Sequence, residues 1–248
     1  MTSSSDQGHI RNAVNYDKLI LTCTSFGTGY NPSKAALIIA AMQAQATAAK
    51  NSLTTMNALM PAYKNAVTAR VTAFKPFDKL ITRVNNALKA SDTTKEVIQS
   101  AQTIVRKLQG RRATPKKTEE EKNAATETGK EIVEISASQR GYDNRLDNLD
   151  KLIQLLSSVS QYVPNEADLK IAALTALYAD LKAKNLAVIN AEIPLNNARI
   201  ARNDTMYKDD TGLVDVASDV KIYLRSVFGA TSPQFKQVTG LKFIKYTN

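Results

Sequence analysis

Apolar side chains recur along this chain at the spacing of a long α-helix. Between residues 33 and 90, one set of apolar positions repeats every seven residues, and a second set follows it by three residues. Spacings of three and four residues place both sets on one stripe of a helix. The two sets are Ile39, Ala46, Leu53, Met60, Val67, Phe74, Ile81 and Leu88, and Met42, Ala49, Met56, Tyr63, Phe77 and Val84. The pattern predicts one helix over residues 33–90.

Two prolines fall inside this predicted helix, Pro61 and Pro76. Proline lacks the backbone N–H and its ring crowds the preceding turn, so each should disturb the helix. The heptad phase continues through both positions without a slip. We therefore expect kinks at the two prolines, and no break.

The rest of the chain also has the periodicity of helices. The predicted segments are residues 10–24, 95–109, 135–162, 166–208 and 213–228. Gly110 and Gly229 follow the ends of two of them, as is common at helix C-termini. Pro194 should kink the segment 166–208. Residues 111–130 have no periodicity and almost no large apolar side chain, so they are expected to be a solvated loop, and residues 229–248 a C-terminal tail.

These segments predict an all-α fold without a strand. The short connections favour antiparallel neighbours, so residues 95–109 and 135–162 should pack beside parts of the two long helices as a four-helix section. We expect a single domain over residues 1–248, an elongated antiparallel helical bundle with a four-helix core and terminal helices. A weak internal symmetry of helix lengths accompanies two Lys-Leu-Ile runs, at 79–81 and 151–153.

The positive charge lies in the first half of the chain. The 248 residues carry a net charge of +10, with 18 basic and 8 acidic residues in 1–124 and 15 of each in 125–248. A basic surface can bind a polyanion such as nucleic acid through its phosphates. The candidate residues are Lys64, Arg70, Lys75, Lys79, Arg83, Arg106, Lys107, Arg111, Arg112, Lys116 and Lys117. The alternative is a solvated face whose charge is complemented by acids of the second half, such as Asp143, Asp147 and Asp150.

The segment 35–62 is unusually poor in charge and carries Lys50 alone. Loss of charge and small side chains are typical of helix interfaces. This segment is therefore a candidate interface, either for self-association into a homo-oligomer or for binding another protein. The residues are Ile39, Met42, Ala46, Ala49, Leu53 and Met56. The alternative is that the rest of the same chain already covers them.

Candidate chemistry is sparse. The chain has one His, His9, and one Cys, Cys23, so these two types cannot supply the three or four ligands of a zinc site. His9 lies in a polar segment and is expected to be a surface residue. We expect no catalytic residue, no cofactor and no metal. The longest uncharged run near the start spans 15 residues, which is short for a membrane span of about 20. With no signal peptide visible, we expect a cytoplasmic protein, and signal-independent export stays open.

Several short segments resemble an uncharacterised family of bacterial all-helical proteins. They are Thr211-Gly212-Leu213-Val214-Asp215, the VFGATSP run at 227–233, Gly240-Leu241-Lys242-Phe243 and Asn31-Pro32-Ser33-Lys34-Ala35. The family has no known activity, so the resemblance implies a bacterial origin and assigns no catalytic or binding residue. The sequence favours a non-enzymatic structural or interaction protein that self-associates. A polyanion-binding protein is the alternative, and a helical pore-forming-toxin-like component is third.

Overall fold

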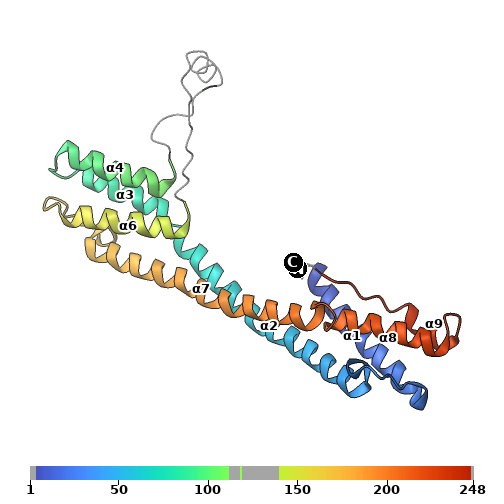
Figure 1. The fold of residues 1–248 in the computed structure, drawn as a ribbon. Coiled ribbons are helices and arrows are strands. Elements are labelled where there is room, and N and C mark those ends of the chain that lie inside the picture. Colours follow the sequence, from blue (N-terminus) through green and yellow to red (C-terminus); the bar gives the residue numbers. More distant parts are fainter. Residues whose placement is uncertain (1–3, 112–117, 119–139, 247–248) are drawn as a thin grey trace. The chain divides into compact units, whose positions relative to one another are not determined.

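The computed structural model describes residues 4–111, 118 and 140–246 (Figure 1). These residues form α-helices and short 3-10 helices and contain no strand, so the predicted all-α fold is confirmed. The α-helices are α1 (Ser4–Ser25), α2 (Ile39–Phe74), α3 (Phe77–Lys89), α4 (Lys95–Gln109), α6 (Tyr142–Ser157), α7 (Ile171–Tyr207), α8 (Leu213–Phe228) and α9 (Pro233–Thr239). Most of the predicted loop 111–130 lies outside the described residues.

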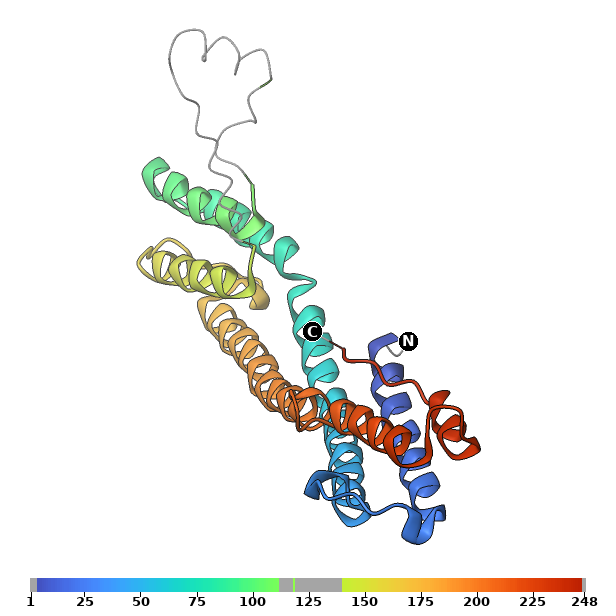
Figure 2. The ribbon, with the colours of Figure 1, turned by 45° about the vertical axis from the view of Figure 1, so that its right-hand side comes forward.

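The chain divides into two compact units, where the sequence analysis expected one domain. Unit 1 comprises Met1–Lys64 and Ala191–Asn248, and unit 2 comprises Asn65–Asn190. The helices α1, α8 and α9 belong to unit 1, and α3, α4 and α6 to unit 2 (Figures 1 and 2). The long helices α2 and α7 each contribute residues to both units.

The helix predicted over 33–90 is divided at Pro76. Pro61 lies inside α2, whereas Lys75 and Pro76 form a turn between α2 and α3. The heptad phase conceals this break, because Phe74 and Phe77 are both buried core residues on either side of it. Pro194 lies inside α7. The start also differs, since a 3-10 turn at Ala35–Leu37 precedes α2.

Local signals fix the ends of the shorter helices. The Thr94 side chain accepts a hydrogen bond from the Val97 N–H at the start of α4. Gly110, with φ of 65°, ends that helix in the left-handed region, which glycine adopts without a steric penalty. Gly229 follows the last residue of α8. The predicted bounds of α4 and α8 are confirmed.

The core of unit 1 includes the C-terminal segment that was expected to be a tail. Residues of α1, α2, α7, α8 and α9 form one buried apolar cluster, in which Tyr16, Met42 and Leu224 are fully buried. After α9, the Asn12 side chain donates to the Ile244 carbonyl oxygen (2.7 Å) and accepts from the Ile244 N–H (3.1 Å). This pair of bonds holds the last described residues against α1.

The core of unit 2 contains the predicted four-helix section. Apolar residues of α4 and α6 pack with parts of α2 and α7 and with α3. Phe77, Leu108 and Leu149 are among its fully buried side chains. Figure 1 shows α3, α4 and α6 lying side by side in this unit.

The two units repeat one local structure. The sequence Tyr-x-Pro-x-x-Ala-x-Leu-x-Ile-Ala-Ala occurs at 30–41 and again at 162–173. In each copy the tyrosine hydroxyl donates to the carbonyl oxygen of the leucine, from Tyr30 to Leu37 at 2.7 Å and from Tyr162 to Leu169 at 2.9 Å. A 3-10 turn and the first turn of a long helix follow both tyrosines. The chain therefore contains a direct repeat of this turn and its long helix, which the weak symmetry of helix lengths did not indicate.

Each unit combines the first part of one repeat with the last part of the other. Unit 1 contains α1, the Tyr30 turn and the start of α2, together with the end of α7, α8 and α9. Unit 2 contains α6, the Tyr162 turn and the start of α7, together with the end of α2, α3 and α4. Corresponding positions in the two units can therefore be compared directly.

Candidate functional site

Five of the six residues expected to mediate self-association lie in the core of unit 1, and the sixth, Met56, is buried beside Arg202. Met42, Ala46, Ala49 and Met56 are buried, and Ile39 and Leu53 are partly buried and packed against the same core. The charge-poor face of α2 is covered within the chain itself, so the alternative interpretation of this segment holds in the structure. Self-association would have to use other residues.

Polar contacts within unit 1 show what covers this face. The Tyr16 hydroxyl of α1 donates to Gln45 Oε1 (2.7 Å), and Gln45 Nε2 donates to the Thr211 carbonyl oxygen (2.7 Å). Lys50 pairs with Asp17 of α1 at 2.8 Å. Residues of α1 and the Thr211 turn therefore lie beside this face of α2.

The basic residues predicted for polyanion binding are used in several different ways. Arg70 donates to Asn185 Oδ1 (2.9 Å), and its guanidinium lies 4.0 Å from the centre of the Tyr142 ring. Arg83 forms a two-bond ion pair with Asp168, and Arg106 donates to Thr103. Lys64, Lys75 and Lys107 are exposed. Arg112, Lys116 and Lys117 lie outside the described residues.

Two of the predicted basic residues do gather in unit 2. Lys79 and Arg111 line one open pocket of about 320 Å³ with Arg140, Asp78, Thr82 and Gln109. Arg140 lies 3.2 Å and the buried Arg145 2.5 Å from the Asp78 carboxylate. Sequence reasoning missed both arginines. The sequence feature that could have indicated them is Asp78. It is the one acidic residue between 33 and 90, so basic partners could be expected around it.

Large aliphatic side chains lie exposed along one face of α7. Leu186, Ile193 and Ile200 are seven residues apart, and Ile189 lies between the first two. Their exposed fractions are 53, 55, 60 and 42%, respectively. The spacing puts all four on one stripe of the helix, away from the buried positions Leu181, Val188 and Leu195. We call these four residues the α7 stripe.

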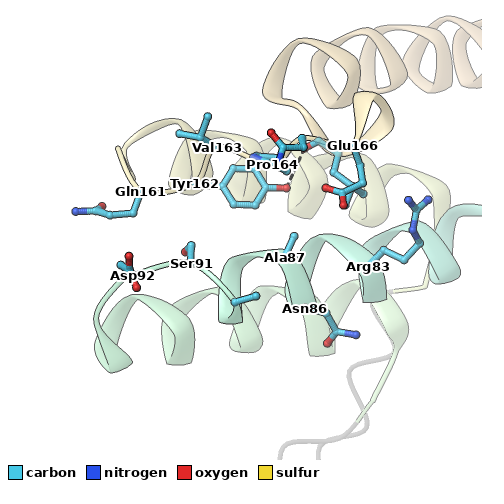
Figure 3. Close-up of a pocket in the computed structure, with 13 residues that line it drawn as sticks. Arg83, Asn86, Ala87, Ser91, Asp92, Gln161, Tyr162, Val163, Pro164 and Glu166 are labelled. Atoms are coloured by element: carbon cyan, nitrogen blue, oxygen red, sulfur yellow. Dashed lines mark hydrogen bonds between the residues drawn. The ribbon is translucent and has the colours of Figure 1, made fainter.

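An open pocket of about 710 Å³ lies in unit 2, between α3 and the Tyr162 turn (Figure 3). In Figure 3, the Ala87 methyl group points from α3 towards Tyr162 and Pro164. Arg83, Asn86 and Asp92 lie on the α3 side, and Gln161 and Glu166 on the side of the turn. Burial raises the pKa of Tyr162 to about 12, so its hydroxyl stays a hydrogen-bond donor at neutral pH.

The single histidine is buried, where a surface position was expected. His9 Nδ1 shares a hydrogen bond with the Tyr207 hydroxyl, and its ring meets the Tyr246 ring edge-on, with 5.3 Å between centroids. Tyr207 of α7 and Tyr246 of the C-terminal segment are distant from His9 in sequence, so the residues around His9 in the sequence gave no sign of these contacts. Within the described residues, no group of three or more His, Cys, Asp or Glu is placed to hold a metal ion.

Comparisons with known proteins identify no relative. No family model matches the chain, and neither the curated proteins nor the solved structures contain a significant match. The resemblance to a bacterial helical family stays a prediction. None of the helices in the described part of the chain is long and apolar enough to cross a membrane.

Proposed function

We propose that the protein is a non-enzymatic helical protein that self-associates through the α7 stripe. The observation that supports the proposal is the set of four large aliphatic side chains exposed along one helix at heptad spacing. Singly exposed apolar side chains are common on protein surfaces, but an aligned row of them favours an interface. Heptad spacing is also the pattern by which two helices pack together.

A second copy of the chain suits this stripe. Because its four side chains are uncharged and aliphatic, the stripe is complementary to itself in a twofold contact. Such a contact would bury eight aliphatic side chains, four from each copy, that are about half-exposed in the single chain. We therefore expect a concentration-dependent dimer.

Sedimentation velocity over a hundredfold concentration range tests this function. The unmodified protein should shift from monomer to dimer as concentration rises, and Ile193→Glu should shift the midpoint to at least about tenfold higher concentration. Ala201→Glu adds the same charge at an exposed position off the stripe and should leave the equilibrium unchanged. A monomer at all concentrations, or equal behaviour of the two variants, contradicts the proposal.

Polyanion binding by unit 2 is the second candidate. It is favoured by the pocket where Lys79, Arg111 and Arg140 meet around one acid, Asp78. The affinity of a single-stranded oligonucleotide, measured by fluorescence anisotropy, should fall steeply between low and moderate salt. Lys79→Gln with Arg111→Gln should weaken it, whereas Lys236→Gln in unit 1 should not. Equal affinity for these variants would remove this candidate.

A further inference from the structure

The pocket beside the Tyr162 turn has a counterpart in unit 1 that is filled by a side chain of the chain itself. Helices α3 and α8 can be aligned by burial. The four buried residues of α3 match four of the six buried residues of α8, with Phe77, Ile81, Val84 and Leu88 at the positions of Leu213, Ala217, Val220 and Leu224. This alignment puts Tyr223 of unit 1 at the position of Ala87 in unit 2. It also puts Asp219 at the position of Arg83.

The ion pairs support this alignment. In unit 1, Asp219 of α8 pairs with Lys34 of the Tyr30 turn at 2.5 Å. In unit 2, Arg83 of α3 pairs with Asp168 of the Tyr162 turn. The signs are reversed, but in each unit the same helix position pairs with the turn beside it.

In unit 1, the Tyr223 ring occupies the place beside the turn. It meets the Tyr30 ring edge-on, at 5.4 Å between centroids and an interplanar angle of 89°. Its hydroxyl oxygen accepts a hydrogen bond from the Asn31 N–H at 3.0 Å. The turn of unit 1 therefore receives both the ring and the phenolic oxygen of a tyrosine.

In unit 2, the same place is open. Ala87 has only a methyl group where unit 1 has a phenol ring, and the residues around it line the pocket of about 710 Å³. The part of the turn that leads into the long helix is the same in both units. Tyr162 keeps its bond to Leu169, and the backbone angles match, with φ and ψ of −65° and 121° at Glu166 and −73° and 116° at Lys34. The Val163 N–H, which corresponds to that of Asn31, bonds only within the turn, to the Gln161 carbonyl oxygen.

We propose that the unit 2 pocket binds a phenol ring from outside the chain, as a free phenol or as a tyrosine side chain. The ring takes the place of Tyr223, edge-on to Tyr162 and above the Ala87 methyl group (Figure 3). Its oxygen accepts from the Val163 N–H, which gives up its bond to the Gln161 carbonyl oxygen. Six apolar residues surround the ring, namely Ala87, Ala90, Tyr162, Val163, Pro164 and Leu169. Polar and charged side chains, among them Asn86, Ser91 and Gln161, make up the rest of the lining. The inference is independent of self-association.

Titrations of the full chain followed by two-dimensional ¹H–¹⁵N NMR test the proposal. Two probes, 4-methylphenol and N-acetyl-tyrosinamide, carry a phenol group. A third, N-acetyl-phenylalaninamide, differs from the tyrosine probe only in lacking the hydroxyl. We expect the phenols to shift the amide signals of Val163 and Ala87 with dissociation constants of about 1 mM, and the phenylalanine probe to bind at least about threefold more weakly. Tighter binding of the tyrosine probe than of 4-methylphenol identifies a tyrosine side chain as the source, and the reverse identifies a free phenol.

A filled-pocket variant provides the second arm. Ala87→Tyr should restore the arrangement of unit 1, so phenol binding should fall at least about tenfold. Ala183→Tyr places the same ring on an exposed position of unit 2 and should leave binding unchanged. If neither phenol shifts the Val163 signal in the unmodified protein, the proposal is overturned, whether or not Ala87→Tyr folds. Unchanged binding by folded Ala87→Tyr also overturns it.

Discussion

The hydroxyl of Tyr30 donates a hydrogen bond to the carbonyl oxygen of Leu37, seven residues further on, at 2.7 Å. The bond closes the turn that leads into α2, and both residues are buried in unit 1. Tyr162 and Leu169 make the same bond before α7 in unit 2. Because each long helix is entered through such a turn, the hydroxyl fixes where the helix begins.

Removing either hydroxyl should destabilise the protein. Tyr30→Phe and Tyr162→Phe each leave a buried carbonyl oxygen without its donor, which costs about 1–3 kcal/mol. The loss for Tyr30→Phe should lie at the upper end of this range, because the Tyr30 hydroxyl also lies 3.5 Å from Met42 Sδ. Urea denaturation followed by circular dichroism measures the change. Tyr178→Phe, at a half-buried position of α7, should stay within about 0.5 kcal/mol; a similar loss there would contradict a specific role of the turn.

The hydrophobic pattern was sufficient to predict the class of fold and most of the helices. The stripe of α4 and its capping residues Thr94 and Gly110 are local signals, so the bounds of this helix were predictable. The break at Pro76 was not predictable, because the turn formed by Lys75 and Pro76 preserves the heptad phase of Phe74 and Phe77. Proline can kink or end a helix, and the packing on both sides decides which.

The candidate residues were less predictable, since their surroundings come from distant parts of the chain. Ala46 and Ala49 have the composition of an interface, and the structure shows that the partner is the chain's own unit 1. Arg140 and Arg145 are more than sixty residues from Asp78 in sequence. The unit 2 pocket depends on a comparison of Ala87 with Tyr223, which requires both helices to be aligned by burial.

The buried Arg145 should depend strongly on Asp78. Its guanidinium lies 4.5 Å from the Phe77 ring centre, and desolvation by burial lowers its pKa although Asp78 opposes this. Asp78→Asn should cost about 1–3 kcal/mol, because it leaves the buried Arg145 charge without its partner, although Asp78 itself is 43% exposed. Adding Arg145→Met should recover part of that loss, since the apolar side chain suits the Phe74 and Phe77 rings. Urea unfolding of the four proteins of this double-mutant cycle measures the coupling, and additive losses would contradict it.

The Cys23 thiol should be unreactive in the folded protein. It is fully buried in unit 1, and desolvation raises its pKa to about 12, so the thiolate is scarce at pH 8. Labelling with a thiol-reactive dye should therefore be slow and should accelerate with urea as unit 1 unfolds. Because the thiol is neutral in the folded state and ionises near pH 9 when unfolded, its contribution to stability should fall as pH rises from about 9 to about 12. Rapid labelling without urea would contradict the burial of Cys23.

The two bonds between Asn12 and Ile244 should hold the C-terminal segment on unit 1. Asn12→Ala removes both bonds, whereas Asn12→Asp keeps the acceptor for the Ile244 N–H but loses the donor to its carbonyl oxygen. We expect the free energy of unfolding to fall by about 2–3 kcal/mol in the first variant. Hydrogen exchange at the Ile244 amide should accelerate strongly for Asn12→Ala and less for Asn12→Asp, because only the aspartate still accepts from that N–H. Asn15→Ala, which removes only a solvent-exposed bond to the Lys242 carbonyl oxygen, is the control. Equal exchange rates at Ile244 in all three variants would show that other contacts hold the segment.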